Sequence, residues 1–310
     1  MDVVGDGPVL VVGPWYVDLI FCELARPVRP GTEVFAEEFD VVAGGAFTLA
    51  MALHRLGHEV VWVTDFGTDL FSRHVLARAR AEGLDETGFA HHSVPVRNVT
   101  AVLSDSTDRA MVSFRDRLAA PSLTTVLERN RPRMLLLPIL RYDADTAAGL
   151  DIACELGVEV FMDCQDVAGT LDDPALREVL GRVDIFAPNV DEALRLTGAS
   201  TLDEALELLS AVVDTVIVKR GGAGATAVRR GRRVDVGAVA VTAVDTTGAG
   251  DCFNAGFVHA TLRGQPLGEC LSTAVACGAA AVTGLGSAGA PDLTELARWL
   301  AEVPRPGTSR

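Results

Sequence analysis

A carboxylate follows a run of small residues in the last third of the chain. The heptad Asp-Thr-Thr-Gly-Ala-Gly-Asp at 245–251 leads into a segment that reads as a helix beginning within the glycine run. Glycines let a backbone turn tightly against a ligand, and unpaired amides at a helix N-terminus bind phosphate. The pattern predicts an anion hole at Gly248, Ala249 and Gly250, with Asp251 placed to take a proton from an incoming hydroxyl. The alternative is a helix-capping turn without chemistry.

Two other segments have polar residues at spacings suited to a nucleotide. Asn189 and Glu192 are one helical turn apart, so both can face one cleft. An Asn N-cap with Glu three residues later explains the same pair without any function. Lys219 follows a strand-like run, and Gly221 and Gly224 come directly after it. This spacing is typical of a loop that approaches phosphates and ribose, although a glycine-rich hairpin turn is the alternative.

Composition indicates a globular protein with an acidic surface. The 310 residues are 49% hydrophobic and 22% charged, with a net charge of -15. Such a charge argues against binding nucleic acid or an anionic membrane, which needs a basic face. The six cysteines have no C-x-x-C spacing, the N-terminus has no signal-peptide pattern, and no apolar run reaches about 18 residues. We therefore expect a soluble cytoplasmic protein without a membrane span.

Short β-branched runs alternate with helix-like stretches through most of the chain. This alternation predicts an α/β fold in which helices cover both faces of a mainly parallel sheet. Ligands bind such sheets beyond the carboxyl ends of the strands, and the heptad fits that rule because it follows the apolar run Ala238–Val241. Asp163 faces the same side, with no role assigned. The predicted strands are Val9–Val12, Val60–Val63, Met134–Leu137, Val158–Phe161, Asp184–Phe186 and Val216–Val218.

Two stretches break the alternation. Residues 16–42 and 94–119 are strand-like and rich in turns, without helical periodicity. They predict hairpins that meet as a small sheet over the site, although plain surface loops are the alternative. Residues 221–236 read as a local hairpin. The tail at 304–310 is expected to be disordered.

Together these segments resemble the ribokinase-like (PfkB) family of ATP-dependent carbohydrate and nucleoside kinases. The resemblance runs from about Val9 to Ala290. It implies a three-layer α/β/α sandwich with a mainly parallel central sheet, forming a single kinase domain at 1–303. It also implies a small β-sheet lid made from about 14–42 and 94–120, which in the family often forms a dimer interface.

The resemblance also implies roles for the motifs. Asp251 would be the catalytic base, and the amides of 248–250 would hold the transferring phosphoryl group. Glu192 would help to position Mg²⁺ through water, and Asn189 would lie near the phosphates of ATP.

Other positions match nucleotide and cation sites of the family. Lys219, Gly221 and Gly224 would contact ATP, and Val275 lies on a small-residue helix that would pack beneath the adenine. A possible K⁺ site is implied, mostly through backbone carbonyls, by Asp245, Thr247, Ala281, Gly284 and Gly286.

The acceptor-side match is weaker. Asp18, Gly44, Gly45 and Thr48 match the N-terminal signature. Arg115 matches a lid arginine that in some relatives contacts an acidic or phosphorylated sugar, although an exposed lid arginine without that role is the alternative. Departures from the family occur at Tyr16 and Thr48, where relatives have Asn, and at Leu140, where ribose-specific relatives have Glu. Because buried hydrogen-bonding groups decide the choice of a polar substrate, these changes argue against ribose.

The leading hypothesis is an ATP-dependent kinase that phosphorylates a hydroxyl of a small carbohydrate. A nucleoside kinase of the same family is the first alternative, because an apolar wall could hold a base. A non-catalytic paralogue that binds sugar or nucleotide is the second. We further expect a homodimer joined through the lids, because exposed apolar strands are usually covered by a partner. The apolar residues behind this expectation are Leu19, Ile20, Phe21, Val34, Phe35 and Phe39.

Overall fold

The computed structural model describes residues 7–105, 109–118, 121–165, 169–286 and 288–309. The first six residues of the predicted domain, parts of the second lid stretch (106–108 and 119–120) and Arg310 lie outside this range. In the described part, no helix is both long and apolar enough to cross a membrane.

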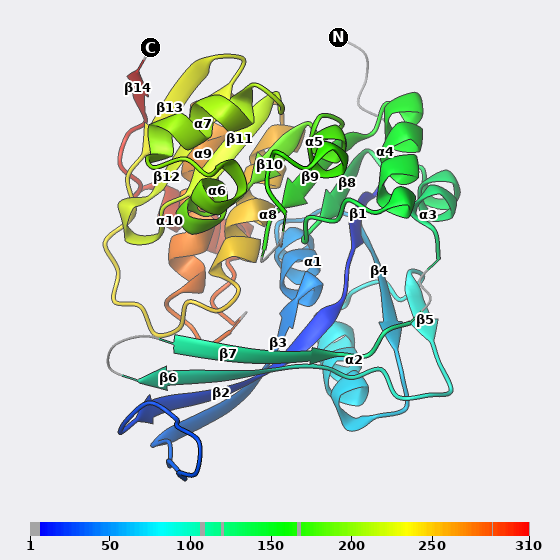
Figure 1. Cartoon of the computed structure of the whole chain (residues 1–310), viewed down its shortest axis with the longest axis vertical. Helices are drawn as coiled ribbons and strands as arrows, with labels where there is room; N and C mark the ends of the chain where they lie inside the picture. The colour runs from blue at the N-terminus through cyan, green and yellow to red at the C-terminus, as the bar shows by residue number, and fades with distance from the viewer. Residues whose placement is uncertain (1–6, 106–108, 119–120, 166–168, 287, 310) are drawn as a thin grey trace.

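The described strands form one large sheet and one small sheet (Figure 1). The large sheet has the order β14-β13-β12-β11-β10-β9-β8-β1-β4-β5. From β11 to β5 the neighbours are parallel, whereas β11 to β14 are antiparallel. Its strands are β1 (Val9–Val12), β4 (Val60–Phe66), β5 (Phe89–His91), β8 (Met134–Leu137), β9 (Glu159–Asp163), β10 (Ile185–Ala187), β11 (Thr215–Lys219), β12 (Ala225–Arg229), β13 (Arg232–Val236) and β14 (Gly307–Ser309).

An apolar core lies on each face of the large sheet, because its central strands are apolar on both sides. On β1, Val9 and Val11 enter one core and Leu10 enters the other. The first core is covered by α1 (Ala46–Arg55), α2 (Leu70–Ala81), α8 (Ala249–Leu262), α9 (Leu267–Ala281) and α10 (Leu293–Leu300). The second is covered by α3 (Leu123–Asn130), α4 (Ala144–Leu156), α5 (Pro174–Leu180), α6 (Val190–Thr197) and α7 (Leu202–Ser210). The predicted three-layer α/β/α sandwich is confirmed.

The small sheet is the predicted lid. Its order is β3-β2-β6-β7, in which two antiparallel hairpins are joined by parallel pairing of β2 with β6. Figure 1 shows it beyond the end of the large sheet toward which β1 runs. The chain passes directly from β1 into β2, so the lid is attached at the carboxyl end of the central strand. Its strands are β2 (Trp15–Leu24), β3 (Glu38–Gly45), β6 (Asn98–Asp105) and β7 (Arg109–Arg115).

Two local expectations were wrong. The apolar run Ala238–Val241 forms no strand, and the loop after β13 carries it to the heptad. The tail was expected to be disordered, but Gly307–Ser309 forms β14 and pairs with Arg233–Asp235 of β13. Backbone pairing with an open sheet edge orders this segment although its composition is that of a loop.

Candidate active site

Helix α8 begins inside the glycine run, as predicted. Gly248 is its N-cap and has φ 75°, a left-handed conformation that favours glycine. A Cβ at this position would also lie 3.0 Å from the Cγ2 of Thr48. The turn therefore needs glycine both for its conformation and for its contact with α1.

The start of α8 presents unpaired amides. The N–H groups of Gly248, Gly250 and Asp251 have no hydrogen-bond acceptor among the described residues, whereas Ala249 N donates over 3.4 Å to the carbonyl of Thr246. Unpaired amides therefore occur at the predicted turn, at Gly248, Gly250 and Asp251 rather than at Ala249, and binding of an anion to them stays a prediction. A phosphate at this point would also meet the positive end of the helix dipole.

Asp251 lies in the first turn of α8 and is half-buried. The pKa of this carboxyl is raised to about 7, mainly by burial; the negative charges of Asp163 and Asp18 act in the same direction, and the positive charge of Lys219 opposes them. A carboxyl with this pKa can accept a proton near neutral pH.

Asp18 and the two glycines form one cluster at the end of the lid nearest to α1. The Asp18 side chain lies against Gly44, where a Cβ would be 2.5 Å from Oδ2. Gly45 has φ 65°, and a Cβ there would be 2.8 Å from the carbonyl oxygen of Pro14. Burial raises the pKa of Asp18 to about 6, against a hydrogen bond from Thr100 that lowers it. Any larger residue at position 44 would collide with the Asp18 carboxylate, and any larger residue at position 45 would collide with the Pro14 carbonyl, so both positions require glycine.

Thr48 connects this acceptor cluster with the anion hole. Its side chain is 1% exposed, and its Oγ1 has no hydrogen-bond partner among the described residues. The same Oγ1 would lie 3.5 Å from a Cβ at Gly248. The structure thus brings Thr48 under the glycine turn, next to the acceptor glycines at the start of α1.

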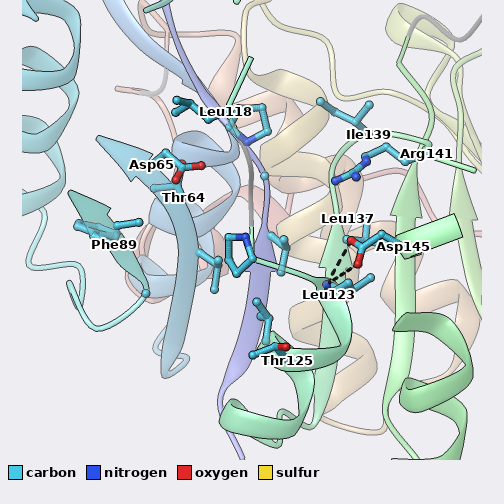
Figure 2. Close-up of a pocket in the computed structure, with 18 of the residues that line it drawn as sticks. Thr64, Asp65, Phe89, Leu118, Leu123, Thr125, Leu137, Ile139, Arg141 and Asp145 are labelled. Carbon is cyan, nitrogen blue, oxygen red and sulfur yellow. Dashed lines mark hydrogen bonds between the residues drawn. The ribbon is translucent and has the colours of Figure 1, made fainter. Parts of the chain in front are cut away.

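Arg115 lies apart from this cluster. It pairs with Asn98 across β6 and β7 and lines a pocket of about 250 Å³ that none of the other predicted acceptor residues lines. Figure 2 shows this pocket between Phe89 and Asp65 on one side and Arg141 and Asp145 on the other. Asn98 also lines it and is buried, with an Oδ1 that has no partner among the described residues.

Leu140, where ribose-specific relatives have Glu, is buried. It is 4% exposed and belongs to the second core, with α3 and α4. Its side chain packs among the other apolar residues of that core.

Lys219 forms a buried network that sequence reasoning missed in part. Its Nζ lies 2.8 and 2.7 Å from the two carboxylate oxygens of Asp163. Asn254, from α8, donates to Asp163 Oδ2 over 2.6 Å. A Cβ at Gly250 would lie 3.6 Å from Nζ, so the ammonium is beside the first turn of α8. From the sequence alone, no role was predicted for Asp163 or Asn254. The position of Asp163 at the carboxyl end of β9 was the available signal.

Asn189 and Glu192 form a capping box at the start of α6. Asn189 Oδ1 accepts from Glu192 N over 2.9 Å, and Glu192 Oε2 accepts from Asn189 N over 2.8 Å. Burial raises the pKa of Glu192, and the negative charge of Asp163 raises it as well. The hydrogen bond from Asn189 N and the positive charge of Lys219 lower it. The hydrogen bonds of this pair are those of the capping alternative, and the pair lies near Asp163 and Lys219.

The glycines after Lys219 serve two purposes. Gly221 has φ 52°, and a Cβ there or at Gly222 would meet nothing within 4 Å, so this backbone is open to a ligand. Gly224 has φ 89°, and its Cβ would collide with the carbonyl of Val236. Gly224 is therefore required by the β12–β13 hairpin, so for this glycine the hairpin explanation accounts for the residue without a nucleotide. Val275, on α9, is 6% exposed and belongs to the first core.

The residues matched to a K⁺ site lie in the heptad and in the segment that starts at the last residue of α9, and Asp245 connects the two. Its Oδ1 accepts from Thr247 N over 2.9 Å, and its Oδ2 accepts from Gly286 N over 2.8 Å. Gly284 N donates to the carbonyl of Ala281 over 3.3 Å at the end of α9. Within the described residues, no group of three or more His, Cys, Asp or Glu side chains could hold a metal ion.

Comparison with known proteins gives concordant results. A model of the pfkB family carbohydrate kinases matches residues 8–293. The ribokinase of Haemophilus influenzae is 26% identical over 271 residues, covering 84% of this chain and 87% of that protein.

Solved structures share the fold. Arabidopsis thaliana ribokinase complexed with ribose and ATP has a TM-score of 0.77 and 24% identity, covering 95% of this chain and 98% of that one. A putative ribokinase II from E. coli, in complex with ATP and Mg²⁺, has a TM-score of 0.76 and 24% identity, covering 95% and 99%. With its family model matching most of its length, the chain belongs to the pfkB family of carbohydrate kinases.

Proposed function

We propose that this protein is an ATP-dependent kinase that phosphorylates a hydroxyl of a small carbohydrate, with Asp251 as catalytic base. The observation that carries the proposal is the first turn of α8, where a carboxyl with a pKa of about 7 stands beside three unpaired amides. Asp18, with Gly44 and Gly45, provides a second carboxylate close enough to influence the pKa of Asp251. An acceptor hydroxyl and a phosphoryl group can therefore meet at Asp251.

The described residues fit Mg·ATP. The unpaired amides of α8 suit a phosphate, and the open backbone at Gly221 and Gly222 suits the nucleotide. We expect Mg²⁺ to enter with the phosphates, as is usual for this ion. Glu192 and Asn189 lie at the edge of the site, where they could act on the metal through water. The bound nucleotide supplies the phosphoryl group, and Mg²⁺ neutralises charge on it.

In the proposed reaction, the protein positions groups and moves one proton. Asp18 accepts hydrogen bonds from acceptor hydroxyls, which orients the reacting oxygen. Asp251 accepts the proton of that hydroxyl at a carboxylate oxygen as the new O–P bond forms. The bond between the γ-phosphorus and the β–γ bridging oxygen breaks, and ADP leaves with its electron pair. The amides of Gly248 and Gly250 stabilise the charge on the transferring group, which is the main requirement of such a transfer.

The acceptor is best identified by an assay of ADP release with a panel of neutral sugars, acidic sugars and nucleosides, run with and without Mg²⁺. Activity with a carbohydrate supports the proposal. Turnover of nucleosides alone would replace it by the nucleoside kinase alternative. If no compound is turned over but ligands still raise the melting temperature, the protein is a binding paralogue.

We also propose a homodimer joined through the lids. Side chains alternate across each lid strand, and the face turned away from Asp18 is apolar on all four strands. Ile20 was predicted from the sequence to belong to this apolar surface, but it lies on the Asp18 face and is only 4% exposed. A continuous apolar surface that is exposed at its two edges, on β3 and β7, and half-buried between them is typical of an interface. It consists of Leu19, Phe21, Phe39, Val41, Val99, Ala101, Leu103, Val112 and Phe114.

A further inference from the structure

Lys219 is the only lysine in the chain, among 26 arginines. Elsewhere, every basic side chain other than histidine is arginine, including those in partly buried ion pairs such as Arg55 with Glu82. Composition therefore does not explain a lysine at this position. A compact ammonium on a flexible stem differs physically from a planar guanidinium, which is larger and presents five donors in a fixed fork. The position needs a small, single-point cation.

The local geometry shows what that cation does. The ammonium has three protons, and two are directed to the oxygens of Asp163, at 2.8 and 2.7 Å. Among the described residues, Nζ has no other acceptor. It lies 3.6 Å from the position of a Cβ at Gly250, whose own amide is unpaired. The third proton is therefore available on the side of the anion hole.

Asp163 is itself held on both oxygens. Oδ1 accepts from Cys164 N over 2.7 Å, and Oδ2 accepts from Asn254 Nδ2 over 2.6 Å. The two side chains of the ion pair are only 16% and 10% exposed. A buried pair with these additional hydrogen bonds has one geometry, so the direction of the ammonium is fixed before any ligand binds.

We propose that Lys219 donates a hydrogen bond to the transferring phosphoryl group beside Gly250, and that Asp163 is the positioning residue that holds it there. The inference rests on the proposed kinase function and adds a cationic donor to the amides of α8. The other explanation is a purely structural ion pair between β9 and β11.

A single lysine allows a direct test that does not require turnover. The intact protein is treated with an amine-acylating reagent, and modification of Lys219 is measured by mass spectrometry, with the terminal amine as internal control. We expect Mg²⁺ with a non-hydrolysable ATP analogue to slow acylation of Lys219 at least tenfold, ADP to slow it less, and the terminal amine to be unaffected. Equal protection by ADP and the triphosphate analogue, or none by either, would overturn the proposal even if the protein is an active kinase.

Variants then separate the two roles. Lys219→Met should lower kcat about 100-fold or more, as expected for loss of a phosphoryl donor, with KM for the acceptor changed less than about threefold. Asp163→Asn keeps an acceptor oxygen for the ammonium, so it should retain more activity than Asp163→Ala. Arg233→Met, which breaks a partly buried ion pair with Asp235 on β13, is the matched control and should keep normal kcat.

The pH profile gives a further readout. The charged groups that act on Asp251 are Asp163 on β9, Lys219 on β11 and Asp18 on β2. Removing the charge of Lys219 should move the acid limb of kcat/KM to higher pH, and Asp163→Asn should move it to lower pH. If Lys219→Met does not fold, the double variant Lys219→Met with Asp163→Asn, which removes both buried charges, is measured in its place. Near-normal kcat in either folded variant lacking Lys219 would refute the role.

Discussion

Asp251→Asn should make the protein more stable while nearly abolishing its activity. The substitution keeps the shape of the side chain but removes both its charge and its ability to take a proton. General-base catalysis contributes about 10²- to 10⁴-fold, so kcat should fall by about that factor. Binding of the acceptor should largely survive, because Asp18, Gly44 and Gly45 are unchanged.

The stability gain can be estimated from the pKa. The pKa of Asp251 rises from 3.8 to about 7 on folding, mainly through burial. Because the folded carboxyl holds its proton more tightly than the unfolded one, stability is lost as the pH rises from 3.8 to about 7. At 1.36 kcal/mol per pKa unit, the full cost is about 4 kcal/mol above pH 7 and about 2 kcal/mol at pH 5. These are upper values, because Asp251 is half-buried rather than enclosed.

Urea denaturation of both proteins at pH 8 and pH 5, without ligands, measures this effect. The variant should be the more stable protein at both pH values, with the larger difference at pH 8. Cys252→Ser, at the next position of α8, tests whether any substitution in this turn gives the same result. An Asp251→Asn protein that is less stable at pH 8 would contradict the cost of burying this carboxylate, and turnover near the normal rate would show that Asp251 is not the base.

Replacing Phe39 and Val112, on the outward face of the lid, by Glu should give a monomer by light scattering, with a raised KM for the acceptor and little change for ATP; a monomeric unmodified protein at micromolar concentration would contradict the dimer. Arg115→Ala should raise KM about tenfold or more for carboxylated or phosphorylated acceptors, since it removes a charge-assisted hydrogen bond, and an equal effect on neutral sugars would exclude that role. The pKa of His58 is lowered to about 4, first by burial and then by the charges of His259 and Arg133. Its neutral form is therefore favoured by folding, so the contribution of His58 to stability is lost as the pH decreases from 6.5 toward 4, opposite in sign to that of Asp251; His58→Gln should remove this loss, so that its stability relative to the unmodified protein increases as the pH falls through this range, and an unchanged difference would refute the assignment.

The sequence predicted the parts of the molecule that depend on local patterns. Buried runs such as Met134–Leu137 are strands at the predicted residues, and α8 begins where the glycines indicated. The lid was predictable because two segments lacked helical periodicity, although only the fold could show which face of β2 carries Asp18. Thus Leu19 and Ile20, adjacent in sequence, have opposite environments.

The remaining features depend on contacts between distant segments. Asp163 and Lys219 are 56 residues apart and meet only because β9 and β11 flank β10 in the large sheet. The β14 strand was missed because its partner, β13, supplies the hydrogen bonds, whereas its own composition is that of a loop.

The position of β1 has a consequence for how the chain folds as it is made. Val9 pairs with Val60 on one side and with Met134 on the other. During synthesis, the first partner becomes available roughly 50 residues after β1 and the second only after more than 120, so one apolar edge of the central strand waits for β8. Late closure of long-range pairs slows folding and leaves a strand edge open to other chains. We therefore expect nascent chains that end before residue 134 to associate with chaperones, and those that extend beyond β8 to be released.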